Sequence, residues 1–287
     1  MPLLTAFDPW QSNLCTCPPK FSLSPYTGCS HRCLYCYASS YIRNFSLARG
    51  KKDFIDRLKK ELKKIPPNSF LTIANSSDPY QPLEKKLHLT HACMEILKDF
   101  DLRIMIVTKS ALISQDLELL KKIKKLVICI TLTTLKENLA EKLEAGADLP
   151  SQKLKAITQI AKFVPVICRF DPLIYPLNTG EIKNIVKKVK TAGAAQIITS
   201  TYKAKPDNFN RMIKNFPEHK DTWTDLYLKK GEKRGNYIYL PKDLRRNLIE
   251  KVRQCCIDER LDFSTCREGF SSLNTKICDG SSFFPQP

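Results

Sequence analysis

The chain alternates short β-branched runs with stretches of helical periodicity, and this alternation restricts its fold more than any other feature. Six runs have the length and composition of strands: 21–26, 70–75, 103–108, 126–132, 164–170 and 196–201. Helix-like stretches fill the intervals, at 51–64, 90–100, 114–124, 136–143, 151–162 and 179–192. Strands that alternate with helices form a parallel sheet, because each helix returns the chain to the same edge. Six such units are fewer than the eight of a closed barrel, so we expect an α/β fold with a partial (β/α)6 barrel of the TIM type.

The composition of the sequence changes after residue 201. Residues 202–240 are basic and aromatic and are interrupted by Pro and Gly, and 241–259 has the pattern of a last helix with Pro241 at its start. We therefore expect three parts. These are an N-terminal extension (1–20), the partial barrel (21–201) and a basic, aromatic C-terminal extension of helix and loops with a cysteine-containing tail (202–287).

The composition favours a non-membrane protein with an anionic partner. The 47 Lys and Arg residues exceed the 29 Asp and Glu residues, for a net charge of +18. Part of the excess is the solvated side of an amphipathic helix at 51–64, but the excess extends well beyond it and favours DNA or RNA as a partner. The densest apolar run, 126–130, is far shorter than the roughly 18 residues of a membrane span. The N-terminus lacks the pattern of a secretory signal, so we expect a cytoplasmic protein with no membrane association.

Twelve cysteines in a long chain without a signal indicate metal binding or reduced core thiols rather than a disulfide scaffold. Three of them lie within apolar stretches, and we expect them in the core: Cys93, Cys129 and Cys168. Six lie near the two ends of the chain: Cys15, Cys17, Cys255, Cys256, Cys266 and Cys278. Their spacing is too wide for a standard zinc finger, although folding could gather the tail cysteines with Cys15 or Cys17 into a second metal site. The alternatives are core thiols or, for Cys266 or Cys278, a reactive hydrogen-donating thiol.

The remaining three cysteines, Cys29, Cys33 and Cys36, form a CxxxCxxC motif directly after the first predicted strand. That position places them at the mouth where the carboxyl ends of the strands bind ligands. Thiolates suit zinc or iron–sulfur clusters. His31 lies inside the motif, but zinc ligands rarely interleave in this way. Three thiolates on a four-iron cluster leave one iron open to a substrate or cofactor, and we favour this interpretation.

These residues carry a resemblance to a known family. The motif lies in SPYTGCSHRCLYCYA, with the aromatic Tyr35 before the last cysteine, and NSSDPYQPLE, VTKS, ITLTTL, CREGF and CDGS follow in order. The chain resembles the radical S-adenosylmethionine superfamily from about residue 20 to 280, in the branch similar to spore photoproduct lyase, also described as DNA repair photolyase-like. The resemblance implies a [4Fe-4S] cluster, S-adenosylmethionine bound to its open iron, and an electron donor such as ferredoxin or flavodoxin. It also implies reductive cleavage of the cofactor to a 5′-deoxyadenosyl radical that abstracts hydrogen from a substrate.

The resemblance assigns roles to individual positions. Cys29, Cys33 and Cys36 match the cluster ligands. The positions that match the family's cofactor contacts are Tyr35 at the adenine, Ser76, Ser77 and Asp78 at the methionyl amino group and ribose, Lys109 at the methionyl carboxylate, Thr131 at the ribose or carboxylate, and Arg169 in the mouth.

The substrate stays open at the level of the sequence. Spore photoproduct lyases carry a hydrogen-donating cysteine at the end of the second strand, where this chain has Asn75 or Ser76. Nucleic acid is the favoured substrate class, as a lesion or a modified base, and a peptide or small molecule is the alternative. Phosphate contacts are expected from Tyr202, Lys203, Lys205, Arg211 and Lys214, and base stacking from Tyr227, Tyr237 and Tyr239. A different class of protein, a non-catalytic nucleic-acid-binding protein with structural zinc, is the second alternative.

Overall fold

A computed structural model describes residues 2–7, 14–73 and 76–284 of the chain. Its main sheet follows chain order, with seven strands parallel: β2 (Phe21–Leu23), β5 (Phe70–Ile73), β6 (Arg103–Thr108), β7 (Leu126–Thr131), β8 (Val166–Leu173), β9 (Gln196–Thr201) and β12 (Asp262–Thr265). The short strand β1 (Thr5–Ala6) pairs antiparallel with β2 at one edge. The six predicted strands therefore exist in the predicted order. The partial-barrel prediction is confirmed.

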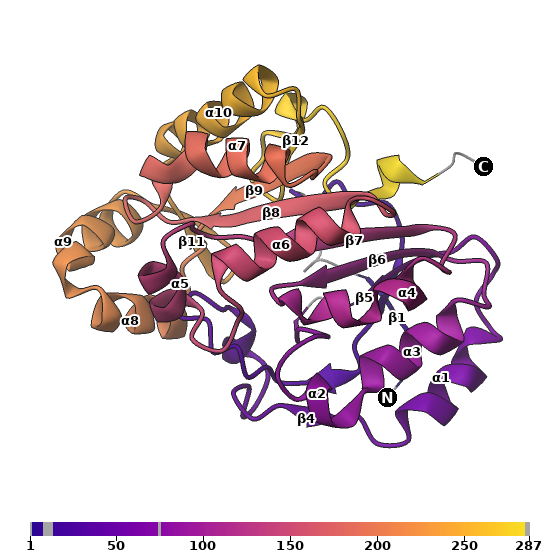
Figure 1. The fold of residues 1–287 in the computed structure, drawn as a ribbon. Coiled ribbons are helices and arrows are strands. Elements are labelled where there is room, and N and C mark those ends of the chain that lie inside the picture. The colour runs from indigo at the N-terminus through magenta and orange to yellow at the C-terminus, as the bar shows by residue number, and fades with distance from the viewer. Residues whose placement is uncertain (1, 8–13, 74–75, 285–287) are drawn as a thin grey trace.

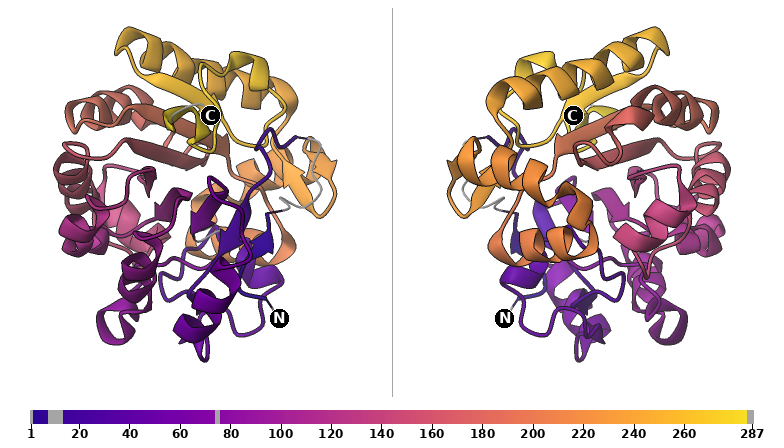
Figure 2. Two further views of the ribbon diagram at one scale, coloured as in Figure 1. Left: turned by 90° about the vertical axis from the view of Figure 1, so that its right-hand side faces the viewer. Right: turned by 90° about the vertical axis from the view of Figure 1, so that its left-hand side faces the viewer.

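Most of the helices cover the outer side of this sheet, which curves around a concave inner side, and others lie at the carboxyl ends of its strands (Figures 1 and 2). They are α1 (Phe54–Leu62), α2 (Glu84–Leu87), α3 (Leu89–Leu97), α4 (Leu117–Leu120), α5 (Glu137–Leu143), α6 (Pro150–Ile160), α7 (Ile182–Thr191), α8 (Pro206–Asn215), α9 (Lys220–Trp223) and α10 (Lys242–Asp258). Within the described residues, no helix is both long enough and apolar enough to cross a bilayer.

The local sequence explains these elements. In α1 the buried residues Phe54, Leu58 and Leu62 recur every four positions and pack toward α3, while the lysines between them face solvent. Strand β7 lies in the middle of the sheet, and all six of its residues are buried, as expected for a parallel strand covered on both faces. Prolines stand at the first position of α6 and α8, where a missing N–H leaves no hydrogen bond unmade.

The structure differs from the sequence prediction in three elements. The predicted strand 21–26 is two strands, β2 and β3 (Tyr26–Thr27), and β3 pairs with β4 (Arg49–Gly50) to close the loop that carries the CxxxCxxC motif. The predicted helix 114–124 is a 3-10 turn (Ala111–Asp116) followed by the short α4, because Ser110 Oγ accepts a hydrogen bond from Leu112 N and starts the turn early. Strand β12 was not predicted, because four residues beside a turn-rich tail carry too little periodicity.

Strand β12 extends the sheet into the predicted C-terminal extension. It pairs in parallel with β9, and α10 packs on α7 and β9. The division into 1–20, 21–201 and 202–287 stays a prediction, but the sheet itself continues past residue 201.

The C-terminal tail fills the interior of the partial barrel. Cys278 and Phe284 pack against inward-facing residues of the strands, among them Phe70 and Val127. Gly280 has a φ of +78°, and a Cβ there would lie 3.2 Å from Val127 Cγ1. Glycine at this position therefore lets the tail enter the barrel, and the tail separates the amino-end half of the interior from the mouth.

Candidate active site

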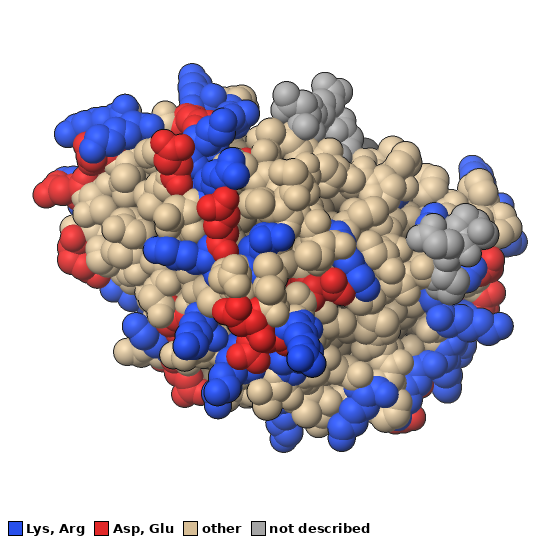
Figure 3. All heavy atoms as spheres, turned by 90° about the horizontal axis from the view of Figure 1, so that it is seen from above, with Lys and Arg blue, Asp and Glu red and all other residues tan. Residues whose placement is uncertain are grey.

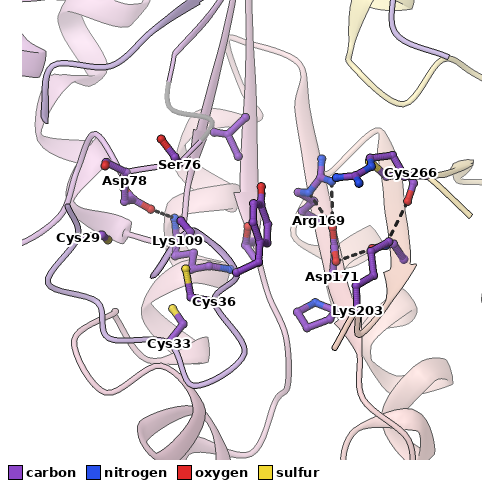
Figure 4. Close-up of a pocket in the computed structure, with 18 of the residues that line it drawn as sticks. Cys29, Cys33, Cys36, Ser76, Asp78, Lys109, Arg169, Asp171, Lys203 and Cys266 are labelled. Carbon is purple, nitrogen blue, oxygen red and sulfur yellow. Dashed lines mark hydrogen bonds and ion pairs between the residues drawn. The ribbon is translucent and has the colours of Figure 1, made fainter. Parts of the chain in front are cut away.

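A cavity of about 450 Å³ opens on the concave side, at the carboxyl ends of the strands. All ten residues that the resemblance assigned line it, namely Cys29, Cys33, Tyr35, Cys36, Ser76, Ser77, Asp78, Lys109, Thr131 and Arg169. Figure 4 shows the three cysteines on one wall and Arg169 with Asp171 and Lys203 on the other. The ten residues come from five separate segments, which parallel topology brings to one end of the sheet. Their individual roles stay predictions.

The cysteine loop is held at its first turn by close backbone contacts. Cys29 N donates to Phe45 O at 2.7 Å, and Gln81 Nε2 donates to Gly28 O at 3.1 Å. Gly28 has a φ of +77°, and a Cβ there would lie 2.6 Å from Leu47 O. A larger residue at position 28 would therefore displace the loop that carries Cys29.

Helix α8 holds the other end of the same loop. Arg211 Nε donates to Leu34 O at 3.1 Å, and Arg211 Nη2 donates to Cys36 O at 2.6 Å. Asn208 Nδ2 donates to Tyr35 O at 3.1 Å. The prediction that Arg211 contacts phosphate is wrong, because its guanidinium is engaged by the backbone carbonyls of the cysteine loop. Periodicity alone placed Arg211 on a helix but could not show which face of the helix the loop covers.

The three thiols suit a metal cluster better than they suit free thiolates. Burial raises the pKa of Cys29 to about 12 and raises the pKa of Cys33 and Cys36 as well, although the cation of Lys109 opposes the shift at Cys33 and Cys36. Desolvated thiols stay protonated until a metal replaces the proton. The donor set consists of three soft ligands on one cavity wall, with the cavity on its open side, and this fits a four-iron cluster with one iron free for a ligand.

Asp78 joins three segments at the mouth. Its Oδ1 accepts hydrogen bonds from Tyr80 N (2.9 Å) and Thr108 Oγ1 (2.6 Å), and its Oδ2 accepts from Lys109 N at 2.7 Å. The buried His31 Nδ1 lies 3.5 Å from the same Oδ2. Asp78 therefore fixes the loops after β5 and β6 against the cysteine loop, in addition to the cofactor contact that the resemblance implies.

Ser77 offers a polar atom to the cavity. Its side chain is buried, and its Oγ has no hydrogen-bond partner within the described residues. A buried hydroxyl of this kind normally has a partner. A polar group of a bound ligand would satisfy it.

Lys109 belongs to a buried charge network that the sequence did not reveal. Its Nζ lies 3.4 Å from Glu144 Oε1 and 5.1 Å from the centre of the Tyr35 ring. Glu144 Oε2 accepts from Lys153 Nζ at 2.6 Å, and Glu144 Oε1 accepts from Thr133 Oγ1 and the Tyr35 hydroxyl. Burial opposes ionisation of Glu144, but Lys153 and Lys109 hold its pKa below the usual range. Burial opposes the charged form of Lys109, but Glu144 together with Asp171, Asp78 and Cys33 outweighs burial and raises the pKa of Lys109.

A second network forms the opposite wall. Arg169 donates to Asp171 Oδ2 from Nε (3.1 Å) and Nη2 (2.9 Å), and Ser200 Oγ donates to Asp171 Oδ1 at 2.6 Å. Lys203 Nζ lies 3.0 Å from Glu268 Oε1 and donates to it. Arg169 and Lys203 both line the cavity. Their roles there stay predictions.

The other predicted phosphate and base contacts are mostly buried. Tyr202 donates to Asn208 Oδ1, and Lys205 Nζ donates to Ser40 Oγ at 2.9 Å. Tyr227 and Tyr239 are each 1% exposed, so the prediction that they stack bases is wrong. These side chains fill the core beneath the mouth, because α8 and the hairpin of β10 (Glu232–Arg234) and β11 (Tyr237–Tyr239) fold back onto the sheet. Tyr202 and Tyr237 line the cavity although they are buried, and Lys214 is exposed on α8.

Five of the remaining cysteines belong to the core or lie beside it. Cys93, Cys129 and Cys168 are fully buried, which confirms the core prediction, and Cys256 joins the core from α10 beside the half-buried Cys255.

Spore photoproduct lyases place a cysteine near the position of Asn75 or Ser76. Ser76 lines the cavity, whereas Asn75 lies outside the described residues.

Comparison with known proteins identifies the class. A model of the Radical SAM superfamily matches residues 23–189, more than half of the 287 residues, so the chain belongs to this superfamily. It is a radical SAM enzyme, and its cofactors are those of the family, a [4Fe-4S] cluster and S-adenosylmethionine. The alternative of a non-catalytic zinc protein is thereby set aside.

Individual relatives are more distant. "Uncharacterized protein MJ0683" of Methanocaldococcus jannaschii is 27% identical over 144 residues, which span 48% of this chain and 54%, about half, of that protein. "Radical SAM Nalpha-GlyT isomerase" of Pseudomonas phage M6 is 22% identical over 255 residues, 85% of this chain and 53% of that protein. A spore photoproduct lyase variant solved with bound AdoMet and dinucleoside spore photoproduct is 15% identical, with a TM-score of 0.64 over 85% of this chain and 75% of that one. The last likeness shows that the two chains share a fold.

Proposed function

We propose that Cys29, Cys33 and Cys36 hold the [4Fe-4S] cluster and that the enzyme directs S-adenosylmethionine cleavage at a nucleic acid substrate. The observation that carries the proposal is the shared cavity. It is lined by the three thiols, by the predicted cofactor contacts and, opposite them, by the Arg169 network. Such a cavity has the size of a site for a cofactor with part of a substrate.

The residues of this chain bind and orient the cofactor. The Lys109 ammonium, kept charged by Glu144, provides a cation for the methionyl carboxylate beside the cysteine loop. Ser77 Oγ provides an unpaired hydroxyl for the amino group or the ribose. The chemistry that a bound cluster would supply is one-electron reductive cleavage of S-adenosylmethionine to methionine and a 5′-deoxyadenosyl radical. The apolar part of the wall, including Tyr35 and Met105, limits access of water to the same space.

Charge at the mouth supports an anionic substrate. Six cationic side chains line the cavity: Lys20, Arg32, Lys109, Arg169, Lys203 and Arg267. Three acidic side chains oppose them: Asp78, Asp171 and Asp279. Glu144 and Glu268, behind the wall, pair with Lys109 and Lys203. An excess of one positive charge remains, in the same direction as the net charge of +18.

The charges on the face shown in Figure 3 do not favour an anionic partner over a cationic one. On the face shown in Figure 3, Lys and Arg gather toward the ends and alternate with Asp and Glu, around a middle that carries few charges. This face does not form a continuous basic track. The cavity is our candidate for nucleic acid contact, and its fold is shared with a spore photoproduct lyase variant solved with a bound dinucleoside spore photoproduct.

An anaerobic assay for 5′-deoxyadenosine tests the function directly. Reconstituted enzyme with S-adenosylmethionine and reductant is incubated with single-stranded DNA, duplex DNA, RNA or peptides, each carrying deuterium at exchange-inert C–H positions. Nucleic acid should stimulate turnover and transfer deuterium to 5′-deoxyadenosine. Stimulation by peptides alone would move the substrate class to peptides, the alternative reading of the sequence.

The salt dependence of binding provides a second test. Each phosphate contact lowers log affinity by about 0.7–0.9 per unit of log salt. Arg32 is exposed at the mouth, so Arg32→Glu should flatten the slope by about one contact. The control Lys59→Glu, on the exposed side of α1, should leave the slope unchanged. Absence of any binding by the wild-type protein at low salt would exclude a nucleic acid substrate.

The proposal also includes a location, an electron donor and a type of reaction. We place the enzyme in the cytoplasm, where a ferredoxin or flavodoxin reduces the cluster. A lesion-repair reaction of the lyase type is one form of the proposed activity, and base modification is the other.

A further inference from the structure

Four cysteines from opposite ends of the chain meet inside the partial barrel. Cys15 and Cys17 precede β2, whereas Cys266 follows β12 and Cys278 lies in the tail. Cys17 and Cys266 pack against Cys278 in one buried cluster, Thr16 Oγ1 lies 4.0 Å from Cys278 Sγ, and Cys15 is two positions before Cys17. All four are free thiols in this structure. Three of the cysteines therefore lie together with Cys15 beside them in sequence, although about 250 residues separate the two halves of the group.

Backbone and charge contacts hold the segments that carry these cysteines in place. Cys266 N donates to Thr199 O at 3.0 Å, which continues the β9–β12 pairing into the cysteine. Lys20 Nζ and Asp279 Oδ2 form an ion pair of 3.4 Å whose two side chains are almost fully buried. That pair joins the N-terminal segment to the tail, next to Cys17 and Cys278. The thiols are thus positioned by buried backbone and charge contacts on both sides.

This arrangement differs from that of ordinary core cysteines. Cys93 and Cys168 are fully buried in the main apolar core. Cys17, Cys266 and Cys278 instead lie together beside the inner face of the sheet and line the cavity. A thiol is a weak hydrogen-bond donor and acceptor, so apolar packing alone gives no reason to gather four of them.

We propose that Cys15, Cys17, Cys266 and Cys278 bind a second metal centre through four thiolates, separate from the cluster on the CxxxCxxC motif. Its ligand chemistry is soft and suits Zn²⁺ or an iron–sulfur cluster. A tetrahedral ion with bonds of about 2.3 Å to sulfur separates its thiolates by about 3.8 Å. Bound metal would join the N-terminal segment to the tail and close the interior of the barrel.

Thiolate ligands take up their final positions around a metal only when the metal is bound. Within residues 2–7, 14–73 and 76–284, no set of three or more Cys, His, Asp or Glu side chains is already arranged around a single-ion position. The same holds for Cys29, Cys33 and Cys36. The arrangement of the free side chains therefore does not distinguish the second group from the first.

Metal analysis of a variant without the first site tests the proposal. In Cys29→Ala/Cys33→Ala/Cys36→Ala protein, purified without oxygen, we expect about one zinc or about four irons per chain, held by the second group. Zinc in a colourless protein would identify a mononuclear site, and iron with sulfide and visible absorption would identify a cluster. Adding Cys266→Ser and Cys278→Ser should remove the metal. Cys255→Ser, on the half-buried position of α10, is the matched control and should retain it.

The readout is independent of the proposed function, because the triple variant has no cofactor cleavage to measure. The proposal is overturned if the folded triple variant holds neither metal after anaerobic incubation with Zn²⁺ or with Fe²⁺ and sulfide. A disulfide among the four cysteines in freshly prepared protein, detected by mass spectrometry after alkylation, would also overturn it. If the triple variant fails to fold, the same comparison is made in protein with an intact CxxxCxxC motif. Cys15→Ser/Cys17→Ser should then lower the metal content relative to Cys255→Ser, and equal content would refute the site.

Discussion

The buried carboxylate of Glu144 gives the sharpest test of how the cavity wall is built. Glu144 and Lys153 are 2% and 1% exposed, and their closest charged atoms lie 2.6 Å apart. Lys109 Nζ lies 3.4 Å away on the other side of the same carboxylate. Glu144→Gln removes the negative charge and leaves Lys153 buried without an ionised partner.

The expected loss can be worked out from these contacts. Removing one partner of a buried ion pair destabilises a protein by about 3–5 kcal/mol, because the other charge stays desolvated. The amide of Gln keeps the size and some hydrogen bonds of the side chain, so we expect about 3 kcal/mol, the lower end of that range, in the free energy of unfolding. Glu141→Gln, on the exposed side of α5, should change it by less than about 0.5 kcal/mol.

Denaturant titration measures both variants, with equal slopes taken as evidence that the unfolded states are comparable. Adding Lys153→Met to Glu144→Gln should recover much of the loss, since it removes the uncompensated charge. If Glu144→Gln destabilises no more than Glu141→Gln, the ion pair does not support the cavity wall and the reasoning is wrong.

The pH dependence follows from the same contact. The folded-state pKa of Glu144 is lowered, so its contribution is complete above the pKa of an unfolded carboxyl, about 4.3, and is lost as the pH falls through the folded-state value. The difference in stability between the wild-type protein and Glu144→Gln should therefore be constant near neutral pH. Below about pH 4.3 it should shrink.

Three further changes address the cofactors. Replacing any one cysteine of the motif in 28–36 with Ala should abolish cluster binding and S-adenosylmethionine cleavage, measured by iron content and 5′-deoxyadenosine yield, whereas Cys255→Ser should retain both. Lys109→Ala should weaken S-adenosylmethionine binding by roughly tenfold or more with the cluster intact, since a charged hydrogen bond contributes about 1.5–3 kcal/mol; unchanged affinity in equilibrium dialysis would remove Lys109 from the site. Arg211→Ala should lower cluster occupancy and speed cluster loss in air, because two loop carbonyls lose their donor, and the effect should be absent in Lys214→Ala, a neighbouring exposed cation.

Local signals in the sequence predicted the strands and the cluster loop well. The strands at 103–108 and 196–201 have the predicted bounds, because apolar β-branched runs between helices produce a strong pattern. The loop was predicted from cysteine spacing alone. Strand β12 was missed because its four residues owe their conformation to pairing with β9 rather than to their own periodicity.

The roles of the charged residues of the site could not be predicted from local sequence. Glu144 follows α5 in a stretch that has the pattern of a solvated helix end, and nothing local distinguishes it from Glu141. Its role depends on Lys153 and Lys109, which approach from other elements. Lys203 and Arg211 likewise carry the composition of a nucleic acid contact, yet the fold turns them toward Glu268 and the cysteine loop.

The sequence by itself determined the alternation of strands and helices, the three closely spaced cysteines and the resemblance that names their chemistry, because each of these is set by residues near one another in the chain. Only the tertiary structure decided which charges are buried in pairs, which basic residues support the loop instead of facing solvent, and that Cys17 lies together with Cys266 and Cys278. Those outcomes depend on contacts between segments far apart in the chain. Periodicity reports which face of an element is apolar, but it does not report what lies against that face.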